Sequence, residues 1–338
     1  MTIHLNLANN SYDITVERGI LKNADKHFNL NRRVLIVTDS GVPKEYAKTV
    51  LSLSKYGVIY TVDQGENSKS LEVFTKLLQT MLDHGFSRKD CVVAVGGGVV
   101  GDLAGFAASA YMRGIDFYNI PTTLLSQIDS SIGGKTAVNL GNIKNVVGAF
   151  YQPKGVLIDS ELLKTLPKRQ ISNGLAEAIK VALTFDSDLF DIIENGDIEK
   201  SIDEIIIRSL KIKKSVVEKD EKESGLRRVL NFGHTVGHGI EVSQENGILY
   251  HGECVALGII PMCNEKIRPR VTDVLKKYNL VNKHEYDWEK IKSAVMCDKK
   301  ADGETVTIIT VDEIGSFKMS DMPCCEIVEL AKNVLESL

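Results

Sequence analysis

Three of the seven histidines of the chain lie within eighteen residues, at positions 234, 238 and 251. His234 and His238 are four residues apart, which places two imidazoles on one face of a helix, where they can bind a metal ion. His251 begins the next helical pattern. A hydrogen-bonded imidazole in the core is the ordinary explanation for one such histidine, but three together favour a metal site.

Glu177 supplies the acidic side chain that such a site calls for. It lies in an otherwise apolar helical pattern, where a carboxylate is costly to bury unless it is paired or bound to metal. An ion pair with Lys180, three residues later, explains it equally well. The spacing therefore leaves open which three of Glu177, His234, His238 and His251 bind the metal.

A glycine-rich segment, GGGVVGD at 96–102, follows an expected strand and precedes an expected helix. Its first, third and last glycines satisfy G-x-G-x-x-G, which lets a backbone approach a pyrophosphate at a helix N-terminus. A turn that is tight for steric reasons alone is the alternative. The acidic residue usual about 20 positions downstream has no clear counterpart, because Asp116 begins a strand. Asp39, at the end of an earlier strand, is better placed to contact a ribose.

Several basic side chains follow these motifs or lie beside expected helix ends. They are Arg113, Lys135, Lys144, Lys213, Arg227 and the pair Lys299 and Lys300. Each alone is best explained as a solvated surface charge. Together they indicate a substrate with both phosphate and carboxylate groups, which need several charge-assisted donors.

In the first half of the chain, expected strands alternate with expected helices. A hairpin at 3–7 and 12–16 is followed by strands at 34–38, 58–62, 91–95, 117–120 and 156–158, with helices at 43–56 and 69–84 and a helix after the glycine turn that ends at Arg113. This alternation predicts a mainly parallel sheet covered on both faces.

After Pro167 the pattern becomes helical. Helices are expected at 171–185, 202–219, 234–243 and 253–266, with one small hairpin at 305–309 and 316–319. The predicted fold class is α/β, with a Rossmann-like nucleotide-binding domain at 1–167 and a mostly α-helical metal- and substrate-binding domain at 168–338.

The composition is that of a globular protein, with 338 residues, 43% hydrophobic and 25% charged. A net charge of −4 argues against nucleic acid or an anionic membrane as partner. The most apolar stretch, 92–111, is glycine-rich and contains Asp102, which is unfavourable for a membrane helix. We expect a cytoplasmic protein, since the N-terminus lacks a secretory pattern and the six cysteines form no C-x-x-C pair.

The motifs taken together closely resemble those of the 3-dehydroquinate synthase family, in family order over nearly the whole chain. They are GENSK at 65–69, GGGVVGD at 96–102, PTT at 121–123, DSSIGGK at 129–135, KN at 144–145, KTLP at 164–167, GLAEAIK at 174–180, DEKE at 220–223, LNFGHTVGH at 230–238, HGE at 251–253 and DKK at 298–300.

The resemblance implies a divalent metal, usually zinc with cobalt as the alternative, bound by Glu177, His234 and His251. His238 is then a hydrogen-bonding or proton-transfer residue. Contacts to NAD are implied for Asp39, Glu66, Lys69, Gly97, Gly98, Val99, Gly101, Asp102, Thr122, Thr123, Lys144 and Thr165. Contacts to the substrate are implied for Arg113, Asp129, Lys135, Asn145, Lys180, Lys213, Glu223, Arg227, Asn231, His238 and one of the two lysines at 299–300, for which we take Lys299. In the family the equivalent of Arg113 reaches across a dimer, so a homodimer is expected.

The implied activity is the conversion of 3-deoxy-D-arabino-heptulosonate 7-phosphate to 3-dehydroquinate and phosphate, a step of the shikimate pathway. A sister sugar phosphate cyclase, a metal-dependent glycerol or alcohol dehydrogenase and a non-catalytic nucleotide-binding protein are the alternatives. The chain departs from common family residues at Gly41, Ala137 and Gly239, but none of these departures removes a charged or ligating group.

Overall fold

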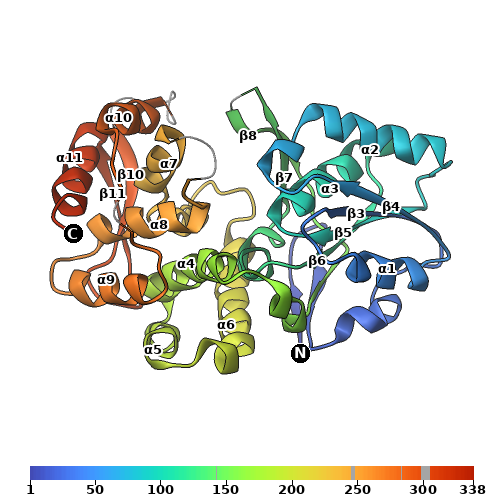
Figure 1. Cartoon of the computed structure of the whole chain (residues 1–338), viewed down its shortest axis with the longest axis horizontal. Helices are drawn as coiled ribbons and strands as arrows, with labels where there is room; N and C mark the ends of the chain where they lie inside the picture. Colours follow the sequence, from blue (N-terminus) through green and yellow to red (C-terminus); the bar gives the residue numbers. More distant parts are fainter. Residues whose placement is uncertain (142, 245–247, 283, 298–304) are drawn as a thin grey trace. The chain divides into compact units, whose positions relative to one another are not determined.

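The computed structural model describes residues 1–141, 143–244, 248–282, 284–297 and 305–338. Contacts between Cα atoms divide the chain into two compact units, Met1–Pro167 and Lys168–Leu338 (Figure 1). Lys299 and Lys300, which the resemblance assigns to the substrate, lie outside the described residues. Among the helices of the described chain, none has the length and apolar character needed to cross a membrane.

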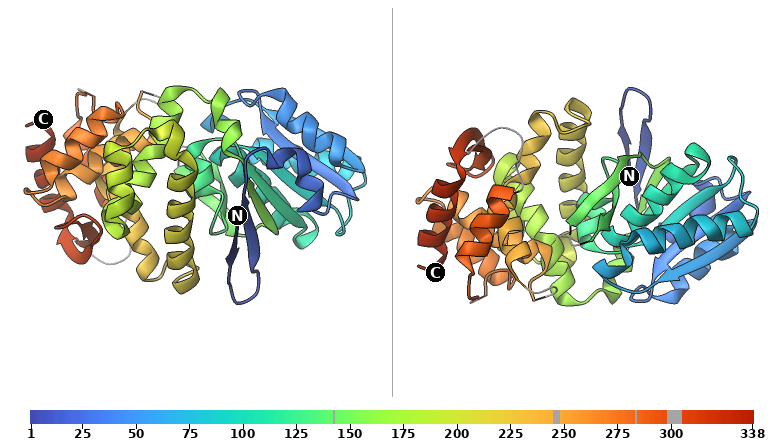
Figure 2. Two further views of the ribbon diagram at one scale, coloured as in Figure 1. Left: turned by 90° about the horizontal axis from the view of Figure 1, so that it is seen from below. Right: turned by 90° about the horizontal axis from the view of Figure 1, so that it is seen from above.

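The first unit contains a seven-stranded sheet in the order β1-β2-β9-β6-β5-β3-β4. Its strands are β1 (Thr2–Leu5), β2 (Tyr12–Val16), β3 (Arg33–Asp39), β4 (Tyr56–Val62), β5 (Cys91–Gly96), β6 (Asp116–Pro121) and β9 (Gly155–Ile158). In this sheet only the pair of β1 and β2 is antiparallel, in the predicted opening hairpin, which is dark blue in Figure 2. Every residue of the central strand β5 is buried, as expected for a parallel strand covered on both faces.

Helices cover both faces of this sheet. They are α1 (Lys44–Leu53), α2 (Leu71–Asp83) and α3 (Gly98–Ala110), with short helical turns η1 (Ile20–Lys26), η2 (Glu66–Ser68), η3 (Tyr111–Arg113), η4 (Ser126–Ser130) and η5 (Ser160–Thr165). One hydrophobic cluster joins alternate residues of β3 and β5 to α2 and α3, and another joins the intervening residues to α1 and η1. The predicted helix at 43–56 is too long, because Tyr56 already begins β4.

A second, antiparallel pair of strands was not predicted. It consists of β7 (Lys135–Leu140) and β8 (Ile143–Phe150). β8 has no buried position, so it lacks the buried apolar alternation by which a strand is recognised in a sequence. The two strands approach closely at Gly148, where an added Cβ would lie 2.1 Å from the carbonyl oxygen of Thr136 and 2.7 Å from the Cβ of Ala137.

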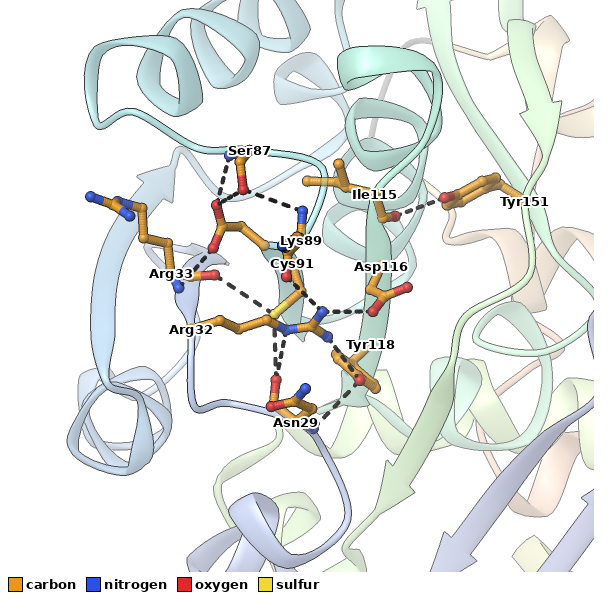
Figure 3. A network of polar contacts seen from close by, with 11 residues as sticks. Asn29, Arg32, Arg33, Ser87, Lys89, Cys91, Ile115, Asp116, Tyr118 and Tyr151 are labelled. Atoms are coloured by element: carbon orange, nitrogen blue, oxygen red, sulfur yellow. Dashed lines mark hydrogen bonds and ion pairs between the residues drawn. The ribbon is translucent and has the colours of Figure 1, made fainter.

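A network around Arg32 ties together the N-terminal ends of the central strands (Figure 3). Its guanidinium donates to the carbonyl oxygens of Asn29 and Lys89, at 2.8 and 2.9 Å, to Asp116 Oδ2 at 2.7 Å and to the Tyr118 hydroxyl at 3.0 Å. Charge-assisted bonds of this kind are stronger than neutral ones. They hold β3 and β6 together at the edge of the sheet remote from the glycine turn.

The second unit is mostly helical, as predicted. Its helices are α4 (Lys168–Phe185), α5 (Ser187–Asn195), α6 (Ile198–Lys219), α7 (His234–Ser243), α8 (His251–Ile259), α9 (Arg268–Lys277), α10 (Trp288–Cys297) and α11 (Cys324–Leu335), with turns η6 (Leu226–Asn231) and η7 (Ile260–Met262) and the predicted hairpin as β10 (Thr305–Thr310) and β11 (Lys318–Pro323). The helix predicted at 253–266 instead begins at His251 and ends at Ile259, since Pro261 lies in the turn that follows.

Candidate active site

The helices α7 and α8 lie side by side in the second unit (Figure 1), and glycines permit their close approach. A Cβ added to Gly258 of α8 would lie 1.9 Å from the carbonyl oxygen of Gly233, the residue before α7. A Cβ on Gly237 would lie 2.9 Å from the carbonyl oxygen of Cys254. This packing brings the first residues of the two helices, His234 and His251, together, with ring centroids 5.2 Å apart.

Glu177 of α4 faces these two histidines. Its Oε1 lies 3.6 Å from His234 Nε2 and 3.5 Å from His251 Nε2, and its side chain is only 2% exposed. Within the described chain neither carboxylate oxygen accepts a hydrogen bond of good geometry, although Oε2 is ion-paired with Lys180. A buried carboxylate that faces two imidazole nitrogens without such bonds fits a bound divalent cation.

The Nδ1 atoms of both histidines already contact oxygen atoms of the protein. His234 Nδ1 lies 3.1 Å from the carbonyl oxygen of Phe232, and His251 Nδ1 lies 3.1 Å from Glu241 Oε2. Such contacts fix the ring of a metal-binding histidine and leave Nε2 for the ion. Glu241 lies on the helix face of His234 and His238, seven and three residues on, so the spacing offered a signal for it that the sequence analysis did not use.

A second group of donor atoms, from His238, Glu241 and His251, also lies within reach of one ion. His238 is exposed, and the Glu241 carboxylate already contacts His251. A bound cation would stabilise the group that contains the buried Glu177 carboxylate more than the group that contains the exposed His238. The geometry therefore favours Glu177, His234 and His251, among the four residues that the spacing left open, and leaves His238 beside them with its ring 5.1 Å from that of His234.

The charges of these residues depend on one another. Burial alone would raise the pKa of Glu177, but Lys180, His234 and His251 hold it well below its usual range. Burial and the charge of Lys180 keep the pKa of His234 well below its usual value, so its ring is neutral. Burial would lower the pKa of His251, but the neighbouring carboxylates of Glu177 and Glu241 raise it to about 9. Binding a metal at His251 Nε2 would release a proton.

We expect the substitution Gly258→Ala to disturb the donor cluster, because the methyl group would push α8 away from Gly233. Overpacking of this kind destabilises a protein by about 1–3 kcal/mol, and the two histidines should separate. Thermal unfolding and zinc affinity by chelator competition measure both effects. Gly239→Ala in α7 is the milder control, since that Cβ would come no closer than 3.1 Å to side-chain atoms of Ile291 and Val295 and 3.3 Å to the carbonyl oxygen of Ile291. Equal zinc affinity in the two variants would contradict the expectation.

In the first unit, the glycine turn connects β5 to α3 beside the end of β3. The chain passes from β3 outward to β4 and then returns to β5 on the other side of β3, which places Asp39 and the turn at a topological switch point, where such sheets bind ligands. Gly97 precedes the 13-residue helix α3 and provides no side-chain cap. A Cβ on Gly98 would lie 3.0 Å from Ser130 Oγ, a buried hydroxyl oxygen without a hydrogen-bond partner in the described chain. This arrangement fits a pyrophosphate.

Lys69 joins several of the expected NAD and substrate residues. It is only 4% exposed, donates to Asp102 Oδ2 at 2.5 Å and also donates to Asn145 Oδ1. Asn139, which the sequence analysis missed, donates to Glu66 Oε1 at 2.8 Å and accepts from the backbone N–H of Asn145 at 2.9 Å. Asn139 lies in the unpredicted hairpin, so no pattern in the sequence pointed to it.

The other expected residues of the first unit occupy element ends and turns. Thr165 ends η5, and its Oγ1 lies 3.1 Å from the hydroxyl oxygen of Tyr46. Burial raises the pKa of Asp39, and the N–H groups of Gly41 and Val42 partly offset this. The remaining residues are Val99 and Gly101 in α3, Thr122 and Thr123 after β6, Asp129 in η4, Lys135 at the start of β7, Lys144 in β8 and Arg113 in η3 at a φ of 69°.

Two basic residues of the second unit are not the surface charges that their sequence context favoured. Lys213 and Arg227 are 6% and 3% exposed. Lys213 also lies inside α6, not at a helix end. Lys180 is 2% exposed and is ion-paired with Glu177.

The parallel sheet and the helical second unit occur together in a class of solved enzymes, the sugar phosphate cyclases. The fold matches 2-deoxy-scyllo-inosose synthase, solved with carbaglucose-6-phosphate, NAD⁺ and Co²⁺, at a TM-score of 0.89 and 26% identity over 99% of this chain and 100% of that one. It also matches 2-epi-5-epi-valiolone synthase from Streptomyces hygroscopicus, solved with NAD⁺ and Zn²⁺, at a TM-score of 0.88 and 28% identity over 98% of both chains. A probable glycerol dehydrogenase from Sinorhizobium meliloti, at 15% identity and a TM-score of 0.64, shares the fold alone.

The chain itself belongs to the 3-dehydroquinate synthase family. The N-terminal family model matches residues 59–173 and the C-terminal model matches residues 174–301. 3-Dehydroquinate synthase from Streptococcus thermophilus is 40% identical over 97% of this chain and 99% of its own length. The enzyme from Enterococcus faecalis is 41% identical over 97% of both. The family resemblance of the sequence motifs is thereby confirmed.

Proposed function

We propose that the chain converts 3-deoxy-D-arabino-heptulosonate 7-phosphate to 3-dehydroquinate and phosphate, as a phosphate-eliminating carbon–oxygen lyase. The full-length relatives at about 40% identity support this activity. The observation that carries it is the buried cluster in which the Glu177 carboxylate, ion-paired with Lys180, faces His234 and His251.

Glu177, His234 and His251 would hold the metal, and one carboxylate oxygen with two imidazole nitrogens suits zinc, with cobalt as the alternative. The metal supplies Lewis acidity toward vicinal hydroxyl groups of the substrate. NAD would accept a hydride from the substrate and later return it, so that the reaction has no net redox change. The cofactor would be held at the glycine turn and by Asp39, Glu66, Lys69, Thr122, Thr123, Lys144 and Thr165.

The side chains of the protein have the remaining tasks. His238 is exposed beside the cluster, where it can hydrogen-bond a substrate hydroxyl or move its proton. Arg113, Lys135, Asn145 and Lys180 would stabilise the departing phosphate dianion. A second set would orient the carbon chain and its carboxylate, namely Asp129, Lys213, Glu223, Arg227 and Asn231. A homodimer, with Arg113 reaching the partner's site, and a cytoplasmic location complete the proposal.

The test is phosphate release by the purified protein from a panel of sugar phosphates. Release is expected only from the heptulosonate phosphate, without accumulation of NADH, and a chelator should abolish it until zinc or cobalt is restored. Faster release from a sugar phosphate that lacks a carboxylate would favour a sister cyclase. NADH formed stoichiometrically from an alcohol would favour a dehydrogenase. Either result would overturn the proposed function.

A further inference from the structure

A single carboxylate closes the loop between α6 and α7. Asp220, the first residue after α6, accepts four hydrogen bonds. Its Oδ1 accepts from the backbone N–H of Ser224 at 2.9 Å and from the Ser224 hydroxyl at 3.2 Å. Its Oδ2 accepts from the backbone N–H groups of Gly225 at 2.7 Å and Arg227 at 2.9 Å.

The position of this aspartate is otherwise unfavourable. An acidic side chain at a helix C-terminus is repelled by the helix dipole, and α6 ends at Lys219. A residue that is unfavourable for the helix itself usually has a role in the structure outside that helix. Burial alone would raise the pKa of Asp220, but the N–H groups of Arg227, Gly225 and Ser224 lower it to about 2. The carboxylate is therefore ionised at any pH at which an enzyme is normally assayed.

The loop that Asp220 closes holds three of the expected substrate residues. Arg227 is buried, and its Nη1 donates to the carbonyl oxygen of Glu221. Asn231 Nδ2 donates to Glu223 Oε1 at 2.7 Å, and Glu223 has a φ of 63°. A positive φ is unfavourable for glutamate and persists only where the surroundings impose it. Both the backbone N–H and the guanidinium of Arg227 are thus fixed by residues at the start of this loop.

We propose that Asp220 is a positioning residue, which holds the loop so that Arg227 and Asn231 can bind the carboxylate of the substrate. This inference rests on the proposed function for the identity of the substrate. Asp220 itself acts through the backbone and makes no contact with the reacting atoms. Its loss should therefore weaken substrate binding and leave NAD and metal binding unchanged.

The experiment compares Asp220→Asn with Asp197→Asn in steady-state phosphate release. Asparagine keeps the size of the side chain but replaces one of the two acceptor oxygens with a donor. We expect the KM for the heptulosonate phosphate to rise about 10- to 100-fold, with a much smaller change in kcat, as for a loss of uniform binding. Asp197 caps the other end of α6 by accepting from the backbone N–H of Glu199, and its substitution should leave KM unchanged.

Two further measurements distinguish a failure of the role proposed for Asp220 from a failure of the proposed function. Ser224→Ala, which removes one bond of the four, should raise KM less than Asp220→Asn and is available if the latter does not fold. Amide hydrogen exchange at Gly225 and Arg227 should be faster in Asp220→Asn than in the wild type, whatever the substrate. Wild-type protein without phosphate release would overturn the proposed function. Active Asp220→Asn protein with the KM of the Asp197→Asn control, or with wild-type exchange at both amides, would overturn the role of Asp220.

Discussion

We expect the Glu177→Gln variant to lose its bound metal, and its turnover number to fall about a thousandfold. Lewis-acid stabilisation of the transition state is worth several kcal/mol, and each 1.36 kcal/mol changes the rate about tenfold. The amide keeps the shape of the side chain but removes the negative charge that faces His234 and His251. Metal content of the purified variant, measured by elemental analysis, and its rate of phosphate release test the expectation together.

Glu253→Gln is the matched control for this substitution. Glu253 is also a buried glutamate of the second unit, 3% exposed, but its oxygens accept from Arg169 at 2.8 Å. Its loss should lower stability and leave the metal in place. The ligand assignment would be wrong if Glu177→Gln kept a full equivalent of metal with wild-type affinity, or if both variants lost metal equally.

The spacing of the histidines left open which residues bind the proposed metal, and only the family resemblance implied Glu177, His234 and His251. His234 and His238 have the better helical spacing, so the spacing alone would have paired these two residues. The choice depends on how α4, α7 and α8 pack, because Glu177 meets His234 and His251 across three helices. That packing depends on close approach at Gly233 and Gly258, which no local pattern in one helix reveals.

The parallel sheet was predictable because buried strands and amphipathic helices leave strong periodic signals. The hairpin of β7 and β8 leaves none, and with it Asn139 and its bonds to Glu66 and Asn145 were missed. The burial of Lys213 could not be predicted from the sequence either, since a lysine in an amphipathic helix is normally solvated. Functional residues are where such general rules are expected to fail.

Two of the departures from common family residues, Gly41 and Ala137, lie at close approaches in the structure. A Cβ at Gly41 would lie 2.4 Å from the side-chain carbon Cδ of Gln64, so a larger residue there requires that flexible side chain to move. Ala137 lies against Gly148, where the two strands of the hairpin are closest. None of these positions contributes a charge to the site, and we expect none of them to abolish activity.

Lys180→Met is expected to destabilise the metal-free protein by about 3–5 kcal/mol, the range for breaking a buried ion pair by removing one partner. Both Lys180 and Glu177 are 2% exposed and are paired with one another. Without the ammonium group, the carboxylate would keep its charge in a buried site or take up a proton. Urea unfolding of the chelated protein measures the loss. Zinc should recover part of it, because a cation at the histidines again neutralises Glu177.

The double variant Lys180→Met/Glu177→Gln separates this explanation from a simple loss of packing. If the destabilisation comes from an uncompensated charge, removal of that charge should restore much of the stability of the metal-free protein, and the two substitutions should be strongly non-additive. Additive losses in the double variant would mean that Lys180 stabilises the unit through its apolar stem alone. In the double variant zinc should no longer stabilise the fold, since the carboxylate that holds it is gone, and this dependence links the ion pair to the metal site.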